Sequence, residues 1–385
     1  MRKIKRALSL LVVTSMVVAS LAACGKKTDS DKFYIGGIGP VTEGAAVYGQ
    51  SVKNGAELAK KEINAAGGIN GKQIEFKFED DVHDVEKSVN AYNTLKDWGM
   101  KILMGTVTSK PCAAVAAETF NDSMFQLTPS ASSTEVIKNG NVFQVCFSDP
   151  NQGIGSAQYI GEHALATKVA VIYDSSDVYS TGIYEKFSEE AKNQGFDIVE
   201  VQAFTAESNS DFSVQIQKAK DAGAELVFLP IYYKEAALIL QQSASLDYAP
   251  TFFGCDGLDG ILSVENFDTA LAEGLMLLTP FAADATDAAT TKFVTDYKAA
   301  YNNEVPNQFA ADGYDAIYIL KAAIEKGEVT PDMSIADINE ALKTAMTEIS
   351  VDGLTGAAMT WNSTGEVNKA PRAVVIQSGA YVAAE

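Results

Sequence analysis

Histidine is nearly absent from this chain, and that absence limits the chemistry it can perform. Only two occur in 385 residues, His83 and His163. Neither has a neighbouring residue at a spacing suited to binding a metal, so we expect no metal centre. Two isolated histidines also cannot supply the base of a nucleophile–base–orienter arrangement, and no Gly-x-Ser-x-Gly nucleophile motif is present. The sequence therefore predicts a protein that is not an enzyme and needs no cofactor.

Positive charge is also scarce. The chain has 30 Lys and Arg residues against 50 Asp and Glu, a formal net charge of −20. An acidic surface disfavours binding to nucleic acid or flat adsorption on anionic lipid. Cysteine is rare as well, with Cys112, Cys146 and Cys255 following an early Cys24. Three cysteines cannot form a complete disulfide framework, and the sequence does not show whether two of them form one bridge.

The chain has a single long hydrophobic run. Residues 1–6 carry four positive charges, and residues 7–20 are apolar but too short to span a bilayer comfortably. This pattern predicts a secretory signal peptide over residues 1–23. The run ends in Leu-Ala-Ala-Cys, which resembles a bacterial lipobox and implies cleavage before Cys24 with a lipid on its sulfur. Residues 24–32 would then form a flexible tether, and loss of the four positive charges would change −20 to −24.

The remaining chain alternates strand-like and helix-like segments. About 360 residues exceed one comfortable hydrophobic core, so two lobes are expected. Alternating strands and helices predict an α/β fold with parallel sheets covered by helices, and ligands of such sheets bind beyond the carboxyl ends of the strands. Strands are expected at 33–40, 72–80, 101–106, 125–130, 142–147, 168–174, 197–204, 225–232, 251–256 and 274–281. Helices are expected at 46–66, 84–97, 151–166, 181–194, 211–221, 233–246, 289–303, 309–325 and 335–346.

Hydroxyl side chains follow the strand at 101–106. The segment 105–111 reads Gly-Thr-Val-Thr-Ser-Lys-Pro and leads into a small-residue helical stretch. Pro111 suits the first position of that helix. The free N–H groups of the first turn, together with the hydroxyls of Thr108 and Ser109, could surround an anion. The alternative is that Ser109 simply caps the helix.

A second segment repeats this arrangement. Residues 127–137 bring Ser130, Ser132 and Ser133 after the next strand, just before another helical start. Two neighbouring strand ends would thus offer hydroxyl and N–H donors to one carboxylate. Asp256 ends the strand 251–256 and could pair with an ammonium group. The alternative for Asp256 is an ordinary turn aspartate.

Taken in order, several segments resemble the type I periplasmic substrate-binding proteins of ABC transporters, specifically the Leu/Ile/Val-binding group. The resemblance runs from Phe33 to the C-terminus. It implies two doubly wound parallel-sheet lobes that close on a ligand about a hinge of three crossings, near Asp149, Pro280 and Thr360. The first lobe would comprise 33–148 and 281–360, and the second 149–280 and 361–385. The segments that carry the resemblance are MGTVTS, QLTPSASS, SDPNQG, VAVIYDSSDVYSTG, FFGCDG, FAADGYDAIYIL, GLTGAAMTWNSTGE and the long stretch IGPVTEGAAVYGQSVKNGAELAKKEINAAGGINGKQIEF.

The resemblance also implies a set of ligand contacts. Ser109 matches a serine that holds the α-carboxylate, and Asp256 matches an acid, usually Glu, that pairs with the ammonium. Ser130 matches a position whose backbone meets the ligand, and Ser132 matches a Thr whose hydroxyl does so. The remaining matches are aromatic residues at the cleft: Tyr48, Tyr179, Tyr232 and Phe309.

Three positions depart from the family pattern. Asp256 is one methylene shorter than Glu, so the ammonium would sit deeper or be reached through water. Lys110 replaces a small polar residue and would point to solvent or meet an acidic ligand side chain. His83 occupies one place of the disulfide in the family's first lobe.

The function implied is that of an extracytoplasmic solute-binding lipoprotein of an ABC importer. It would capture a branched-chain or other neutral aliphatic amino acid and deliver it to a membrane permease. We expect a monomer, held by lipid on Cys24 at the outer face of the cell membrane, or in the periplasm if the cell has two membranes. The alternatives are an extracellular ligand-sensing domain of the same fold, or a binder of amides, urea-like compounds or small carboxylates.

Overall fold

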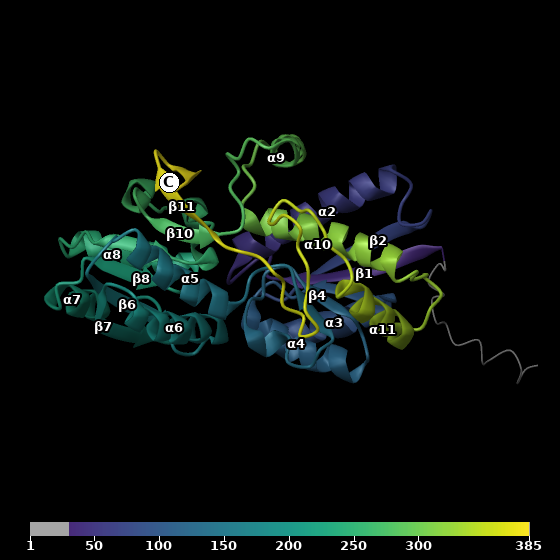
Figure 1. The fold of residues 1–385 in the computed structure, drawn as a ribbon, viewed down its shortest axis with the longest axis horizontal. Helices are drawn as coiled ribbons and strands as arrows, with labels where there is room; N and C mark the ends of the chain where they lie inside the picture. The colour runs from purple at the N-terminus through teal and green to yellow at the C-terminus, as the bar shows by residue number, and fades with distance from the viewer. Residues whose placement is uncertain (1–30, 385) are drawn as a thin grey trace, which may run out of the picture. The chain divides into compact units, whose positions relative to one another are not determined.

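A computed structural model of the chain describes residues 31–384. The predicted signal peptide, the predicted lipidation site Cys24 and most of the predicted tether lie outside the described residues. Two separate sheets organise the described part, each flanked by helices (Figure 1). This arrangement confirms the predicted α/β fold with two parallel-dominated sheets. No helix among residues 31–384 is both long and apolar enough to cross a membrane.

The first sheet is entirely parallel. Its strand order is β2-β1-β3-β4-β5, and each neighbouring pair runs in the same direction. The short strands β3, β4 and β5 are fully buried, as is typical of a sheet covered by helices on both faces. The strands span Lys32–Gly39 (β1), Gln73–Asp80 (β2), Ile102–Gly105 (β3), Gln126–Thr128 (β4) and Val142–Gln144 (β5).

The helices of the first lobe come from both halves of the chain. They are α2 (Ala46–Ala65), α3 (Val85–Trp98), α4 (Ser109–Asn121), α9 (Ala288–Ala300), α10 (Gln308–Lys326) and α11 (Ile335–Met346), with the short 3₁₀ turn η1 (Thr134–Val136). Helices α2 and α10 pack backbone against backbone. A Cβ added to Gly55 would meet Ala310 O at 1.9 Å, and one added to Gly313 would meet Val52 O at 2.2 Å. Glycine at both positions therefore allows the close approach of the two helices.

The second sheet joins five parallel strands to an antiparallel hairpin. Its order is β12-β11-β10-β9-β8-β6-β7, with β11 antiparallel to both β10 and β12. This C-terminal hairpin is absent from the strands predicted from the sequence. The strands span Lys168–Asp174 (β6), Asp197–Phe204 (β7), Leu226–Leu229 (β8), Thr251–Gly254 (β9), Met276–Thr279 (β10), Arg372–Gln377 (β11) and Ala380–Ala383 (β12). Its helices are α5 (Asp149–Glu162), α6 (Val178–Glu190), α7 (Ser213–Asp221) and α8 (Tyr233–Ser245), with the 3₁₀ turns η2 (Ala191–Asn193), η3 (Asp256–Leu258), η4 (Ile261–Ser263) and η5 (Thr269–Ala272).

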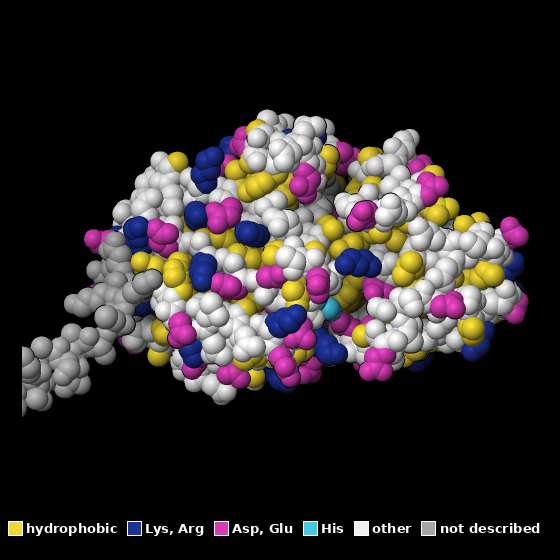
Figure 2. Space-filling model, turned by 180° about the vertical axis from the view of Figure 1, so that it is seen from behind, with side chains coloured by type: hydrophobic (Ala, Val, Ile, Leu, Met, Phe, Trp, Pro, Cys, Tyr) yellow, Lys and Arg dark blue, Asp and Glu magenta, His cyan; other side chains and the backbone are white. Residues whose placement is uncertain are grey.

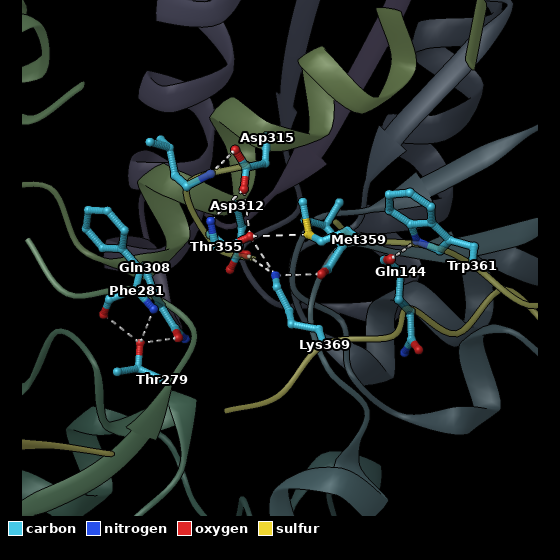
Figure 3. A network of polar contacts seen from close by, with 12 residues as sticks. Gln144, Thr279, Phe281, Gln308, Asp312, Asp315, Thr355, Met359, Trp361 and Lys369 are labelled. Atoms are coloured by element: carbon cyan, nitrogen blue, oxygen red, sulfur yellow. Dashed lines mark hydrogen bonds and ion pairs between the residues drawn. The ribbon is translucent and has the colours of Figure 1, made fainter. Parts of the chain in front are cut away.

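The third passage between the lobes lies later than the predicted crossing near Thr360. Trp361 Nε1 donates to Gln144 O at 2.7 Å, and Lys369 Nζ donates to Val145 O at 2.8 Å (Figure 3). These bonds hold residues 361–369 against β5 in the first lobe, so the chain reaches the second sheet only with β11. The segment has no helical or strand periodicity, and only its tertiary contacts show to which lobe it belongs.

A buried ion pair reinforces this part of the first lobe. Lys369 Nζ lies 3.6 Å from Asp312 Oδ1 on α10, and both side chains are almost fully buried (Figure 3). The ammonium also donates to Thr355 Oγ1 at 2.6 Å, and Thr355 in turn donates to Asp315 at the same distance. This network joins α10 to the segment that leads into the second sheet.

Charged side chains of both signs cover the face seen in Figure 2. Acidic and basic groups are interspersed there, and apolar side chains are scattered among them. Many of the charges on the described surface are paired, as in Lys292 with Glu62 and Asp296 at 2.7 Å each. Pairs of this kind contribute little individually to stability.

Candidate functional site

The start of helix α4 forms one wall of the candidate site. The helix begins at Ser109, with Thr108 as its N-cap residue in an extended conformation. Pro111 is therefore the third helical residue and not the first, as the sequence had suggested. Its missing N–H costs nothing there, because the first four N–H groups of a helix lack acceptors within the helix.

Ser109 does not cap the helix, so the capping alternative is wrong. The Thr108 side chain, although at the N-cap, makes no capping bond, and its Oγ1 instead lies 2.9 Å from His83 Nδ1. Ser109 is 1% exposed, and its Oγ accepts a hydrogen bond from Ser133 N at 3.2 Å. The Ser109 proton is left available to a ligand oxygen.

Ser130 and Ser132, which follow β4, lie in different surroundings: Ser130 lines a small internal cavity between the two lobes, and Ser132 is buried outside it. Ser130 lines the cavity while its Oγ donates to Val107 O at 2.7 Å, so its side chain braces the α4 loop. Ser132 is fully buried outside the cavity, and its hydroxyl helps to lower the pKa of Asp149, which burial raises well above its usual range. Ser132 thus does not line the cavity, its Oγ has no hydrogen-bond partner within residues 31–384, and its hydroxyl contact with a ligand stays a prediction.

Asp256 faces this wall from the second lobe, two residues after the end of β9. It is 3% exposed, and Oδ1 accepts a hydrogen bond from the Tyr179 hydroxyl at 2.8 Å. Its backbone is also held, since Asp256 N donates to Gln152 Oε1 at 3.2 Å and Gln308 Nε2 donates to Asp256 O at 3.2 Å. Burial raises the pKa of Asp256 to about 7, and the hydrogen bond from Tyr179 opposes that rise. A ligand ammonium would compensate the buried carboxylate and favour its ionised form.

Aromatic side chains from both lobes enclose the space between these walls. Tyr48 on α2 stacks on Phe309 with ring centroids 4.0 Å apart, and Tyr179 stacks on Tyr232 at 5.0 Å. The Tyr48 hydroxyl crosses between the lobes to donate to Gly257 O. A Cβ on Gly257 would lie 2.6 Å from the Tyr179 hydroxyl, so only glycine fits at this position.

Together these groups bound one small internal space, which we call the cleft cavity. The space open to the centre of a water molecule is about 10 Å³, which is enough to hold roughly one water molecule. Seven of the eight predicted ligand-binding residues line it, and Ser132 is the exception. The complete lining is Tyr48, Val107, Thr108, Ser109, Ser130, Tyr179, Tyr232, Asp256, Gly257 and Phe309.

A larger outer cavity of about 410 Å³ adjoins this space and shares the walls formed by Tyr179 and Tyr232. Lys110 lies there, and its Nζ donates to Ser176 O of the second lobe at 3.2 Å. Its ammonium lowers the pKa of nearby Asp177, although burial brings that pKa to about 6. Lys110 thus contacts the opposite lobe.

Two glutamines that position Asp256 were not predicted from the sequence. Gln152 lies on α5 and Gln308 at the start of α10, and both are buried and bonded to the Asp256 backbone. Gln152 belongs to the segment SDPNQG, which carried the family resemblance. Nothing in the local sequence around Gln308 indicated its contact with a residue more than fifty positions earlier.

The described cysteines carry no disulfide. Cys112, Cys146 and Cys255 are free and buried. Burial raises the pKa of Cys112 to about 11, so this thiol is unreactive at neutral pH. No group of three or more His, Cys, Asp or Glu within residues 31–384 is arranged to hold a metal ion.

Comparison with known proteins gives the same family over nearly the whole described chain. Residues 32–380 match the periplasmic binding protein family. Leu/Ile/Val-binding protein homolog 3 of Brucella melitensis biotype 1 is 31% identical over 77% of this chain and 80% of its own length. The leucine-, isoleucine-, valine-, threonine- and alanine-binding protein of Pseudomonas aeruginosa is 28% identical over 83% of this chain and 84% of its own.

A solved structure agrees with these relatives. The branched-chain amino acid transporter substrate-binding protein LivJ of Streptococcus pneumoniae, crystallised with isoleucine, superposes with a TM-score of 0.83. It is 27% identical in sequence, and the match covers 92% of this chain and 99% of LivJ. Sequence and fold therefore lead to one conclusion: this chain belongs to the periplasmic binding protein family, the solute-binding proteins.

Proposed function

We propose that this protein captures a branched-chain amino acid outside the cytoplasm and delivers it to the permease of an ABC importer. The observation that carries the proposal is the opposition of Ser109 and Asp256 across one cavity lined by both lobes. A zwitterion brings two full charges, and removing both from water is costly unless each is matched. The site offers hydroxyl and N–H donors on one side and a carboxylate on the other.

The roles of individual residues follow from this opposition. Ser109 and the open N–H groups of α4 would receive the ligand carboxylate, and Asp256 would receive its ammonium. Tyr48, Tyr179, Tyr232 and Phe309 would surround the aliphatic side chain, since aromatic rings provide stiff apolar walls. No charged group lines the cleft cavity besides Asp256, which suits a neutral aliphatic side chain.

Ligand entry requires movement. The cleft cavity has room for about one water molecule, and a branched-chain amino acid is several times larger. The contact of Tyr48 with Gly257 joins the lobes directly, so the lobes must separate or the tyrosines must shift for a ligand to enter. A ligand that touches both lobes stabilises the closed arrangement by its higher affinity for that state.

The lipid anchor and the monomeric state are part of the same proposal. The family's members act outside the cytoplasm, and the lipobox-like sequence before Cys24 would hold this one beside its permease. A tethered protein meets its membrane partner at a raised effective concentration.

A thermal-shift screen of the twenty amino acids on the purified protein tests the proposal. Leucine, isoleucine or valine at about 100 times its dissociation constant should add roughly 2.7 kcal/mol of stability. Ser109→Ala should weaken binding by about 1–3 kcal/mol, because a charged group loses a hydrogen-bond partner. Ser213→Ala is a matched control, since Ser213 is likewise the first residue of its helix but lies outside the cavity. A response only to amides, urea-like compounds or small carboxylates, or equal affinities for wild type and Ser109→Ala, would refute the assignment.

A further inference from the structure

The turn between β2 and α3 holds His83 in a strained backbone conformation. Val82 and His83 both have positive φ angles, 46° and 63°, and a β-branched residue such as valine rarely adopts this left-handed region. Two aspartates fix the turn, since Asp80 Oδ1 accepts from Val82 N at 3.0 Å and Asp81 Oδ1 accepts from His83 N at 2.9 Å. Backbone strain of this kind clusters at ligand sites, so the position of His83 is a candidate for a role in binding.

The His83 ring lies against two residues that line the cleft cavity. Its Nδ1 is 2.9 Å from Thr108 Oγ1, and the ring meets that of Tyr232 edge-on with centroids 5.6 Å apart. His83 itself lines the outer cavity and not the cleft cavity. Burial, together with the nearby Lys110 ammonium, lowers the pKa of His83 to about 4. The ring is therefore neutral at neutral pH, with one nitrogen that donates a hydrogen bond and one that accepts.

Thr108 has a hydroxyl that its helix does not use. It is the buried N-cap residue of α4 but makes no capping bond. The neighbouring Ser109 Oγ accepts from Ser133 N, which leaves the serine proton for a ligand oxygen. His83 can support Thr108 in the same way, with Nδ1–H as the donor and Thr108 Oγ1 as the acceptor. In the opposite tautomer, Thr108 would give its proton to the ring and present only lone pairs to the cavity, where a carboxylate needs a donor.

We propose that His83 is a positioning residue for ligand binding: its Nδ1–H donates to Thr108 Oγ1 and so directs the Thr108 hydroxyl proton to the ligand carboxylate, beside that of Ser109. This inference rests on the proposed function, because it requires a ligand carboxylate at the start of α4. His83 would act entirely through Thr108, without touching the ligand.

The arrangement gives the carboxylate wall a second supported hydroxyl. A carboxylate can accept about four hydrogen bonds, and the hydroxyls of Thr108 and Ser109 would serve it together with the N–H groups that α4 leaves open. A buried charge is costly unless such partners match it, so a misdirected Thr108 hydroxyl should reduce affinity. A merely structural histidine would instead affect binding whether or not Thr108 carries a hydroxyl.

A double-mutant cycle on leucine binding, measured by calorimetric titration, tests this coupling. Thr108→Val removes the hydroxyl and suits the extended N-cap conformation. It should weaken leucine binding about tenfold or more, as expected when a charged group loses a hydrogen bond. His83→Gly removes the ring without backbone strain, because glycine adopts positive φ freely. It should weaken binding at least about threefold in the wild-type background and less than about twofold in Thr108→Val.

Two further variants separate positioning from folding. His83→Asn tolerates a positive φ and keeps an N–H donor as far along the side chain as Nδ1–H, so it should recover most of the affinity that His83→Gly loses. His163→Gly is the matched control, because His163 is exposed at the end of α5 and lines neither cavity. Its leucine affinity should equal that of the wild type. Urea denaturation of each variant checks that it is folded under the conditions of the titration.

The possible outcomes separate this inference from the proposed function. Equal losses from His83→Gly in both backgrounds, no recovery in His83→Asn, or full affinity in Thr108→Val would overturn the role of His83 and leave the proposed function intact. A wild-type protein that binds no amino acid would overturn the proposed function and this inference with it.

Discussion

Among single residues, Asp256 contributes the only charge to the cleft cavity. It is one carbon shorter than the glutamate that the family resemblance leads us to expect at this position, and the structure holds its backbone from two sides through Gln152 and Gln308. A buried carboxylate whose pKa is about 7 is balanced between its neutral and ionised forms. An ammonium ligand shifts that balance toward the ionised form.

Replacing Asp256 tests the ammonium assignment directly. Asp256→Asn should weaken leucine binding by about 2–5 kcal/mol, because the ligand ammonium loses its charged partner. The deaminated analogue 4-methylpentanoate has no ammonium, so its affinity should change much less. Calorimetric titration of both ligands gives the two differences, and equal losses would mean that Asp256 does not pair with the ammonium.

Ser132 shows the limit of reasoning about one residue at a time. It lies two positions from Ser130, and its residue type is as suitable for a ligand contact. Its hydroxyl nevertheless lies beside the buried Asp149, whose backbone N–H donates to Ser132 O at 2.9 Å. Residue type alone does not determine which of two nearby hydroxyls faces the cavity.

Among the structural elements, the contact between α2 and α10 positions two walls of the site. Tyr48 lies on α2 and Phe309 on α10, and their rings stack at 4.0 Å. Gly55 and Gly313 allow the two backbones to approach closely enough for this stacking. The hydrophobic pattern of each helix indicated its buried face but not the distance between the helices.

Gly313→Ala should therefore destabilise the protein. Alanine favours a helix over glycine by about 1 kcal/mol, but the new methyl group would lie 2.2 Å from Val52 O, and overpacking of this kind costs about 1–3 kcal/mol or more. We expect a net loss of roughly 1 kcal/mol or more in the free energy of unfolding, measured by urea denaturation. Gly195→Ala is the control, since a Cβ there meets nothing within 4 Å. A gain of stability in Gly313→Ala would contradict the close packing.

Across the whole molecule, the buried carboxyl groups share one direction of pKa shift. Burial raises the pKa of Asp81 and Asp256 to about 7 and that of Asp312 to about 8. In each case the folded protein holds a proton more tightly than the unfolded chain, whose aspartates titrate near pH 3.9. Between these values the folded state binds more protons, so stability falls as pH rises. His83 acts in the opposite direction, since burial lowers its pKa to about 4, but its contribution is nearly complete by about pH 7.5, where the unfolded histidine has lost its proton.

The free energy of unfolding should accordingly decrease between about pH 6.5 and about pH 8.5. Urea denaturation in the same salt at both values measures the change. Asp312→Asn, which cannot ionise at this position, should reduce the decrease. A stability that rises over this interval would show that these carboxyl groups are already ionised in the folded protein.

The sequence by itself determined the order of the strands and helices, although most of the predicted strands extend a few residues beyond the observed ones. It placed parallel strands and helices in alternation, and it identified the hydroxyls at Ser109 and Ser130 and the carboxylate at Asp256 as groups that follow strands. These inferences succeed because they depend on local spacing and on the rule that ligands meet the carboxyl ends of parallel strands. The C-terminal hairpin of β11 and β12 escaped them, since two short strands that pair with distant partners leave little periodic signal.

Only the tertiary structure determined which side chains and segments face one another. It set Ser109 opposite Asp256, almost 150 positions apart, and kept residues 361–369 in the first lobe through their bonds to β5. The physical reason is that a cleft exists only between packed elements, and burial, pKa and hydrogen-bond partners are properties of that packing.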